Sequence, residues 1–208
     1  MASVEQGPVS NRLVERVKNI LFSSNTEWDV IDAEPATIPD LYKGYICILA
    51  AIGPVAQMIG SIIAPQYALW GGGGGVVGAV ANGIVTYVLT LVGVYVTAVI
   101  IDALAPSFGG QRSLIQAFKV ATYSSTAAWI VGVFAIFPLV SALRIIGFYS
   151  LYLLYLGLPK LMKAPEDKAL VYTLVTIVVA VVVYVVVGVI AGAAVALTVG
   201  MGALAVIH

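Results

Sequence analysis

The chain has 208 residues, of which 61% are hydrophobic and only 10% are charged, and its formal net charge is zero. A soluble domain is about 45–50% apolar and about 25% charged, so a water-exposed fold of this length could not bury so much apolar surface. The neutral balance of charge gives no reason to expect a nucleic acid partner. Membrane lipids are the surroundings that fit this composition.

The first 40 residues are polar and contain no apolar stretch of the kind found in a secretory signal, so we expect them to form an N-terminal arm. After Ser10, apolar residues recur at helical spacing and predict an amphipathic helix that either lies in the headgroup layer or packs on the bundle. These apolar positions are Leu13, Val17, Ile20 and Leu21. Thr26 and Asp29 have the spacing of a capping box, which predicts a second short helix that Pro35 ends.

Five apolar stretches follow the arm, and each is about as long as the 20 residues that a helix needs to cross a bilayer. We predict spans at residues 41–64, 76–101, 116–138, 139–162 and 169–193, the last of them continued by an apolar tail. The predicted fold class is therefore an all-α polytopic membrane bundle, with an arm at 1–40 and a transmembrane domain at 41–208. The uncharged run 169–207 is long enough for nearly two crossings, so a sixth pass is the alternative.

The basic residues indicate the orientation of these spans. With five spans, nine of the ten Lys and Arg side chains fall on the side of the N-terminus, and the loop at 65–75 has none. Cytoplasmic loops carry the excess of positive charge, so the N-terminus is predicted to be cytoplasmic. In a bacterium this would place the protein in the inner membrane.

Arg144 is the tenth basic residue, and it falls inside the fourth predicted span. A charge at membrane depth is a candidate ligand contact. The favoured interpretation is that its long side chain reaches the outer headgroups, with a lipid phosphate as its partner.

Polar and small residues form stripes within the spans. Gln57 lies on the first span, Asn82 and Thr86 on the second, and Ser124 on the third. One interpretation is a hydrated path for a small solute. The favoured one is close helix packing, because small residues let helices approach and hydroxyls bond between them. A similar stripe in the fifth span suggests a homo-oligomer, and it comprises Gly188, Gly192, Ala196 and Gly200.

Catalytic chemistry finds little support in this chain. The only histidine is His208, so a Ser-His pair or a metal-His site within the bundle is not expected. Two buried acids that could share a proton are also missing, since Asp40 and Asp102 lie at the ends of spans. The sequence predicts no catalytic residue, no metal and no cofactor.

Several residues on the predicted cytoplasmic side could form a surface for a protein partner. They are Trp28, Glu34, Asp40 and Asp102. The acidic arm could also fold back on the basic loop that contains Lys160, Lys163 and Lys168, although each exposed pair would contribute little. The sequence leaves both arrangements open.

The order of these segments resembles the Yip domain family of membrane proteins. Similar stretches are Trp28-x-x-Ile31-x-x-Glu34, Leu104-Ala105-Pro106-x-Phe108-Gly109-Gly110, Ala117-Phe118-Lys119-Val120-Ala121-Thr122-Tyr123-Ser124, and Tyr149 to Leu158 followed by Met162, Pro165, Lys168 and Ala169. The resemblance implies five spans, a cytosolic N-terminus and a non-enzymatic role, which in eukaryotes is linked to recruitment of Rab GTPases. The short arm, and Asp40-Leu41-Tyr42-Lys43-Gly44 without the proline of eukaryotic members, indicate a prokaryotic-type relative.

Two functional hypotheses follow from the sequence. The first is a non-catalytic scaffold or adaptor whose cytoplasmic arm and loops meet a protein partner or lipid headgroups. The second is a small transporter or channel that uses the polar faces of the first three spans and Arg144.

Overall fold

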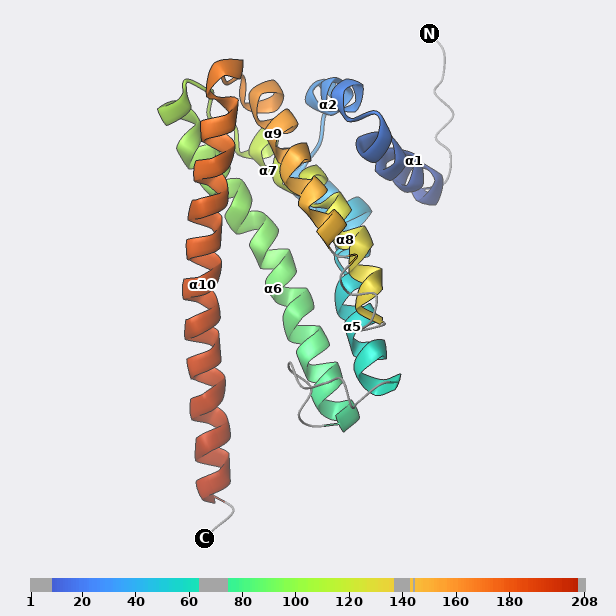
Figure 1. Ribbon diagram of the computed structural model, residues 1–208, viewed down its shortest axis with the longest axis vertical. Helices are drawn as coiled ribbons and strands as arrows, with labels where there is room; N and C mark the ends of the chain where they lie inside the picture. Colours follow the sequence, from blue (N-terminus) through green and yellow to red (C-terminus); the bar gives the residue numbers. More distant parts are fainter. Residues whose placement is uncertain (1–8, 64–74, 137–142, 144, 206–208) are drawn as a thin grey trace.

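The computed structural model is a bundle of helices, and it describes residues 9–63, 75–136, 143 and 145–205 (Figure 1). Within these residues no strand occurs, and five helical stretches are long and apolar enough to cross a membrane. They are Ile38–Ile63, Val76–Phe108, Leu114–Ile136, Ile145–Met162 and Glu166–Val186. The predicted fold class, a polytopic helical membrane bundle with five spans, is confirmed.

The first span is built from several helical pieces instead of one regular helix. It comprises α3 (Ile38–Leu41), the π-helix η1 (Tyr42–Ile46), α4 (Cys47–Leu49) and α5 (Ile52–Ile63). The break between α4 and α5 lies just before Pro54, because a proline has no N–H to donate and its ring clashes with the carbonyl four residues earlier. The span begins three residues before the predicted start, where Thr37 caps α3 by accepting a hydrogen bond from the Asp40 N–H at 3.3 Å.

The second and third spans form the middle of the bundle. Helix α6 (Gly75–Leu104) continues into the 3-10 helix η3 (Ala105–Phe108), and Gly109 then turns the chain with a φ of +78°. Helix α7 (Leu114–Ser124) packs against both α6 and α9, and every residue from 117 to 124 is buried. Helix α8 (Thr126–Val131) and the 3-10 helix η4 (Gly132–Ile136) complete the third span.

The last two helices are α9 (Tyr149–Met162) and α10 (Glu166–Ala205). Helix α10 is continuous over 40 residues, so the uncharged run does not turn back between residues 169 and 205. Figure 1 shows α10 along one side of the bundle, ending far from α1 and α2. The junction between the third and fourth predicted spans, at residues 138 and 139, lies outside the described residues, as do the side chains of the stripe from Gly188 to Gly200.

The N-terminal arm contains α1 (Val9–Phe22) and α2 (Ser24–Ala33). Helix α1 turns Leu13, Val17 and Leu21 toward the core, and its Ile20 is fully buried, so the amphipathic face packs on the bundle. Helix α2 begins at Ser24, two residues before the predicted cap, and the Thr26 hydroxyl donates to the Ser23 carbonyl at 3.0 Å. It ends before Pro35 as expected, with Glu34 in extended conformation.

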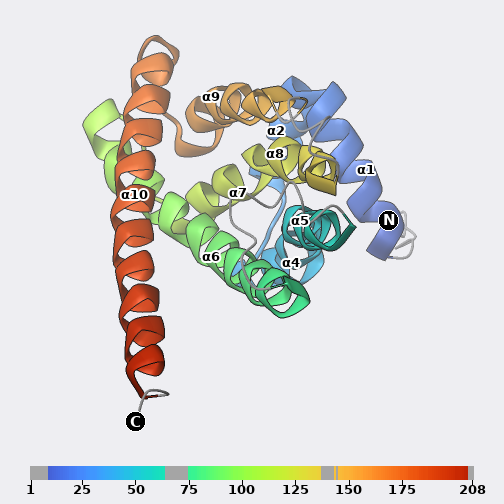
Figure 2. The same cartoon turned by 60° about the horizontal axis from the view of Figure 1, so that its bottom comes forward.

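When the view is turned by 60° about the horizontal axis, α1 and α2 lie on one side of the molecule and α10 on the opposite side (Figure 2). Between them, α7 and α8 occupy the centre and α9 runs beside α2. The arm is therefore part of the packed structure, and the surface that receives α2 is formed by α7 and α9.

Candidate functional site: the α2 seat

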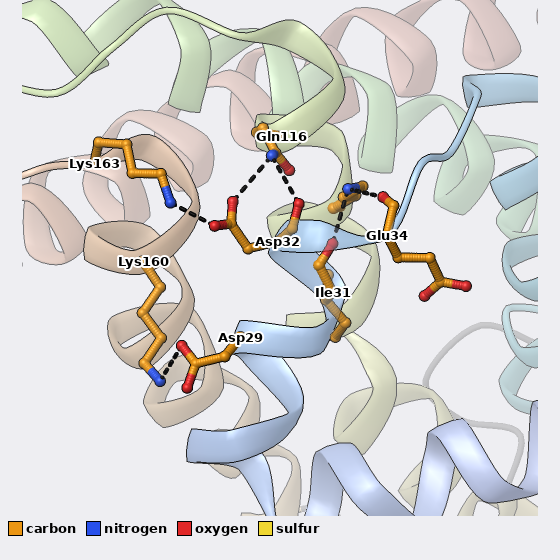
Figure 3. A network of polar contacts seen from close by, with 8 residues as sticks. Asp29, Ile31, Asp32, Glu34, Gln116, Lys160 and Lys163 are labelled. Atoms are coloured by element: carbon orange, nitrogen blue, oxygen red, sulfur yellow. Dashed lines mark hydrogen bonds and ion pairs between the residues drawn. The ribbon is translucent and has the colours of Figure 1, made fainter.

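The densest group of polar contacts in the described residues lies where α2 meets α7 and α9 (Figure 3). We call the receiving surface the α2 seat, and it comprises Gln116, Lys119, Gly157, Lys160 and Lys163. Two of these residues come from α7, two from α9, and Lys163 follows α9 directly, in a left-handed backbone conformation with a φ of +53°.

Two lysines of the seat pair with two aspartates of α2. The Lys160 ammonium lies 2.7 Å from Asp29 Oδ1, and the Lys163 ammonium lies 2.5 Å from Asp32 Oδ2. Lys160 also donates to the Asn25 carbonyl at 2.5 Å. These side chains are partly exposed to solvent, so each ion pair contributes only about 0–1 kcal/mol. The two ion pairs therefore fix the position of α2 on the seat more than they contribute to the stability of the protein.

The apolar face of α2 supplies the buried part of the contact. Trp28 is 0% exposed and Ile31 is 1% exposed. The Trp28 ring lies edge-on to Tyr123, with the ring centroids 6.4 Å apart. A Cβ added to Gly157 would lie 2.8 Å from Trp28 Cζ2, closer than any side-chain carbon can approach. The glycine therefore forms a notch into which the indole fits.

Lys119 is the most deeply buried cation of the seat, at 3% exposed. Its ammonium donates to the carbonyl of Ile31 at 2.8 Å and to the carbonyl of Glu34 at 2.6 Å. These carbonyls belong to the C-terminal end of α2, where the last carbonyls of a helix have no partner within the helix and the helix dipole is negative. Lys119 thus caps α2 from the bundle.

Gln116 lies beside Lys119 on the same helix. Its amide nitrogen donates to Asp32 Oδ1 at 3.0 Å and to the Asp32 carbonyl at 3.3 Å. Its amide oxygen is buried without a hydrogen-bond partner, and so is the indole Nε1 of Trp28. A buried polar atom without a partner costs about 1–3 kcal/mol. The contact between α2 and its seat is therefore well packed but incompletely satisfied.

Arg16 connects α1 to both α2 and α7. Its guanidinium lies 2.6 Å from Glu27 Oε1, also pairs with Glu34, and sits 5.6 Å from the centroid of the Tyr123 ring. Burial by itself would lower the pKa of Arg16, but the neighbouring tyrosine and the two carboxylates raise it above its ordinary value. The planar guanidinium can bridge two carboxylates and stack on an aromatic ring, which a lysine cannot do in the same way.

A cavity of about 650 Å³ lies between the arm and the bundle next to these residues. Its lining includes Arg16, Glu34, Tyr45, Lys119 and Tyr123. The Tyr45 hydroxyl lies 2.7 Å from the Thr126 hydroxyl, and its ring meets that of Tyr123 at a centroid distance of 4.9 Å. The cavity wall is thus amphipathic, with the rings of Tyr45 and Tyr123 and the Lys119 ammonium on the bundle side and Arg16 and Glu34 on the arm side.

The residues predicted as a partner surface have different surroundings. Trp28 is buried in the seat, and Glu34 pairs with Arg16 while its side chain stays 49% exposed. Asp102 is buried at the end of α6 and accepts two hydrogen bonds from Arg112, from Nη2 at 2.7 Å and from Nε at 3.1 Å. Asp40 is exposed at the start of the first span. The structure does not bring these four residues together into one exposed patch.

The four intramembrane candidates also lie apart. Gln57 and Asn82 are exposed on the outside of the bundle, and Ser124 is buried in α7, where it donates to the Ala121 carbonyl at 3.4 Å. Thr86 lines a cavity of about 410 Å³ between α6, α8 and α10. Arg144 lies outside the described residues. Among the described residues, Gln57 and Asn82 are exposed whereas Ser124 is buried, so these three do not line one common cavity with Thr86.

Sequence reasoning missed the two residues that shape the seat, Gly157 and Lys119. The sequence marks Lys119 as one of the basic residues on the side of the N-terminus and as part of a stretch that resembles the Yip family. Nothing in the sequence indicates that its acceptors are backbone carbonyls 85 and 88 residues away. A glycine between leucines in a strongly apolar helix was the available signal for the notch.

Among the described residues, no group of three His, Cys, Asp or Glu side chains could hold a metal ion.

Comparison with known proteins places this arrangement in a family. Residues 18–190 match the Yip1 domain. The chain belongs to the Yip1 domain family. The Yip1 match begins within α1, so both α2 and its seat lie inside the matched region.

Two curated relatives of this Yip1 protein are similar over most of their length. The inner membrane protein YohC of Escherichia coli strain K12 is 29% identical over 168 residues, which cover 76% of this chain and 84% of that protein. The protein of the same name from E. coli O6:H1 strain CFT073 shows the same identity and coverage. No solved structure matches the chain. The predicted family and its prokaryotic type are thus confirmed.

Proposed function

We propose that this Yip1 protein is a non-enzymatic membrane scaffold or adaptor whose α2 end faces the cytoplasm and meets a protein partner or lipid headgroups. Similarity to an inner membrane protein supports the same membrane for this chain. The excess of basic residues on the loops at the α2 end supports a cytoplasmic orientation of that end.

The single observation that carries this proposal is the α2 seat. The charged groups there pair across two elements, as in Lys160 with Asp29 and Lys163 with Asp32, and they position a helix. A catalytic site would instead hold a nucleophile close to a base that can activate it. An arrangement whose polar groups orient a helix on the end of a membrane bundle is suited to recognition.

Deletion of residues 1–35 tests the role of the arm. We expect proteins that are crosslinked to the full chain in its native membrane to be lost, or to be replaced by others, when α1 and α2 are absent. Deletion of residues 1–8 is the matched control, because it leaves both helices in place. If the full chain and the chain without residues 1–35 crosslink to the same set of proteins, the arm is not needed for the adaptor function.

The cavity between α6, α8 and α10 favours a transporter as the second candidate. It is lined by Thr86, Thr90 and Thr97, among others, and the Thr97 hydroxyl lies 3.1 Å from the Tyr184 hydroxyl. Flux of small solutes into liposomes that contain the purified protein tests this function. Thr90→Val removes a hydroxyl from the cavity at nearly constant volume, whereas Asn82→Leu changes an exposed residue outside it and is the control. Selective flux that only Thr90→Val abolishes would favour transport over the scaffold.

A further inference from the structure

We propose that the α2 seat is a docking groove for an acidic amphipathic helix of a protein partner, and that α2 is a releasable occupant that covers the groove until the partner binds. This inference rests on the proposed function, because it requires the α2 end to face the compartment that holds the partner. It goes beyond that function by naming the groove and the chemistry of its ligand.

The ligand is defined by two rows of side chains on α2, each with a spacing of three residues. Trp28 and Ile31 form the inner row and are buried in the seat. Asp29 and Asp32 form the outer row and meet Lys160 and Lys163 (Figure 3). Residues three apart share one side of a helix, and helix-in-groove recognition uses such anchors. A partner helix of the same class would carry an aromatic anchor followed by carboxylates one turn apart.

The groove itself selects a helix with an aromatic residue. The notch at Gly157 admits a flat ring, because any side chain at this position would collide with the indole of Trp28. Lys119 adds a donor for the C-terminal carbonyls of the bound helix, at 2.6 and 2.8 Å from its acceptors. A phospholipid headgroup could accept hydrogen bonds from lysines, but it would use neither the notch nor the fixed spacing between the two rows.

Helix α2 does not satisfy the groove completely. Gln116 Oε1 on the seat and Trp28 Nε1 on α2 are both buried without partners, and release of α2 would let water bond to each of them. The two ion pairs are partly exposed and therefore weak. A partner helix that offers a donor to Gln116 Oε1 would satisfy the groove better than α2 does. This difference in satisfied hydrogen bonds is the reason why a partner helix would replace α2 in the groove.

The backbone on both sides of α2 permits such a release. Helix α1 ends at Phe22 and α2 starts at Ser24, so Ser23 separates them, and a non-helical segment from Glu34 to Thr37 follows α2. Rotation at these two segments would move α2 without unwinding a membrane span. The contacts of Arg16 with Glu27 and Glu34 would have to open or move with the arm.

The experiment uses the full chain in nanodiscs of phosphatidylcholine, with Cys47→Ala and Ser24→Cys. Ser24 is 8% exposed in the docked arm, so the rate of maleimide labelling at this position reports how often α2 is released. The probe is a synthetic peptide with the sequence of residues 22–36. We expect the peptide to raise the labelling rate at least threefold and in a saturable way. The same peptide with Trp28→Ala should leave the rate unchanged.

A charge exchange makes the test specific for the groove. In the chain with Lys160→Asp, we expect a peptide with Asp29→Lys to bind more tightly than the parent peptide, which is the reverse of their order on the parent chain. Fluorescence anisotropy of the labelled peptides measures this order directly. The chain with Asp29→Asn and Asp32→Asn in its own arm, whose groove is easier to vacate, should bind the parent peptide more tightly than the parent chain does.

Three results would overturn the inference. The first is that the parent peptide does not bind even to the chain with the weakened arm, and the second is that the affinities of the two peptides keep the same order on the chain with Lys160→Asp. The third is that phosphatidylglycerol in the nanodisc releases α2 and the peptide does not. The last result would make the seat a site for anionic lipid. Failure of the scaffold function looks different. If the peptides behave as expected while deletion of residues 1–35 leaves the crosslinked proteins unchanged, the groove exists but the adaptor function is wrong.

Discussion

The indole of Trp28 packs against the backbone of Gly157, 129 residues further along the chain, with no room for a side chain between them. This contact joins the N-terminal arm to the fourth span. It is purely steric and apolar, whereas the other contacts of α2 with its seat are ion pairs and hydrogen bonds. The two kinds of contact can therefore be separated by substitution.

Gly157→Ala should loosen the arm without changing any charge. The new methyl group would lie 2.8 Å from Trp28 Cζ2, and the large ring can move only by leaving its buried position. Overpacking of this kind costs about 1–3 kcal/mol. We expect faster maleimide labelling of a cysteine at position 24. Gly44→Ala is the matched control, since nothing lies within 4 Å of the added carbon there, and equal labelling of the two variants would contradict the notch.

Lys119→Met should destabilise the protein more than Lys163→Met. Lys119 is buried and donates to two carbonyls at the end of α2, so its loss leaves buried acceptors without a donor at a cost of about 1–3 kcal/mol. Lys163 forms an exposed pair, and its loss should cost at most about 1 kcal/mol. Thermal unfolding in detergent, followed by fluorescence-detected size exclusion, measures both. Similar melting temperatures for the two variants would show that Lys119 does not hold α2.

Much of the architecture could be predicted from the sequence, because its causes are local. Apolar length determines the spans, and Pro35 and the Pro106–Gly109 turn determine where helices end. The breaks inside spans were less visible. Pro54 interrupts the first span, but the π-helix at Tyr42–Ile46 has no comparable local signal.

The site was harder to predict, because it depends on distant pairs. The acidic character of the arm and the basic loop suggested that they could meet, and Lys160 and Lys163 do pair with Asp29 and Asp32. The distribution of charge along the sequence could not distinguish an arm that folds back on the basic loop from an arm that is exposed to a partner, since the two arrangements place the same charges on the same side of the membrane. Burial of Trp28 depends on a glycine in another helix, and no local pattern connects the two.

Arg16→Lys should free the arm although the charge is kept. The guanidinium bridges Glu27 and Glu34 and stacks on Tyr123, a geometry that a single ammonium cannot reproduce. We expect faster cleavage by chymotrypsin at Phe22, which is 81% exposed at the junction of α1 and α2. Arg12→Lys, on the exposed part of α1, is the control. Cleavage at the parent rate in both variants would mean that Arg16 acts only through its charge.

Salt should release α2 only in part. Screening weakens the exposed pairs of Lys160 and Lys163, each of which contributes about 0–1 kcal/mol, while the buried contacts of Trp28 and Lys119 are screened much less. The two pairs together contribute at most about 2 kcal/mol, which corresponds to about thirtyfold in an equilibrium constant. Raising sodium chloride from about 0.1 M to about 1 M should therefore increase labelling at position 24 by less than about thirtyfold. A larger increase would show that charge, and not the aromatic anchor, holds the arm.

The continuous helix α10 makes a prediction about topology. Forty residues at a rise of about 1.5 Å give a length of about 60 Å, which exceeds the roughly 30 Å of hydrocarbon in a bilayer. If α10 crosses the bilayer as one unbroken helix of this length, its two ends lie on opposite sides of the membrane. In sealed inverted vesicles, where the cytoplasmic face is outside, an impermeant maleimide should label a cysteine in place of Lys168 but not one in place of Ala205. Labelling of both from the same side would require that the chain turns back between these positions, as in a sixth pass, and that α10 is broken within the membrane.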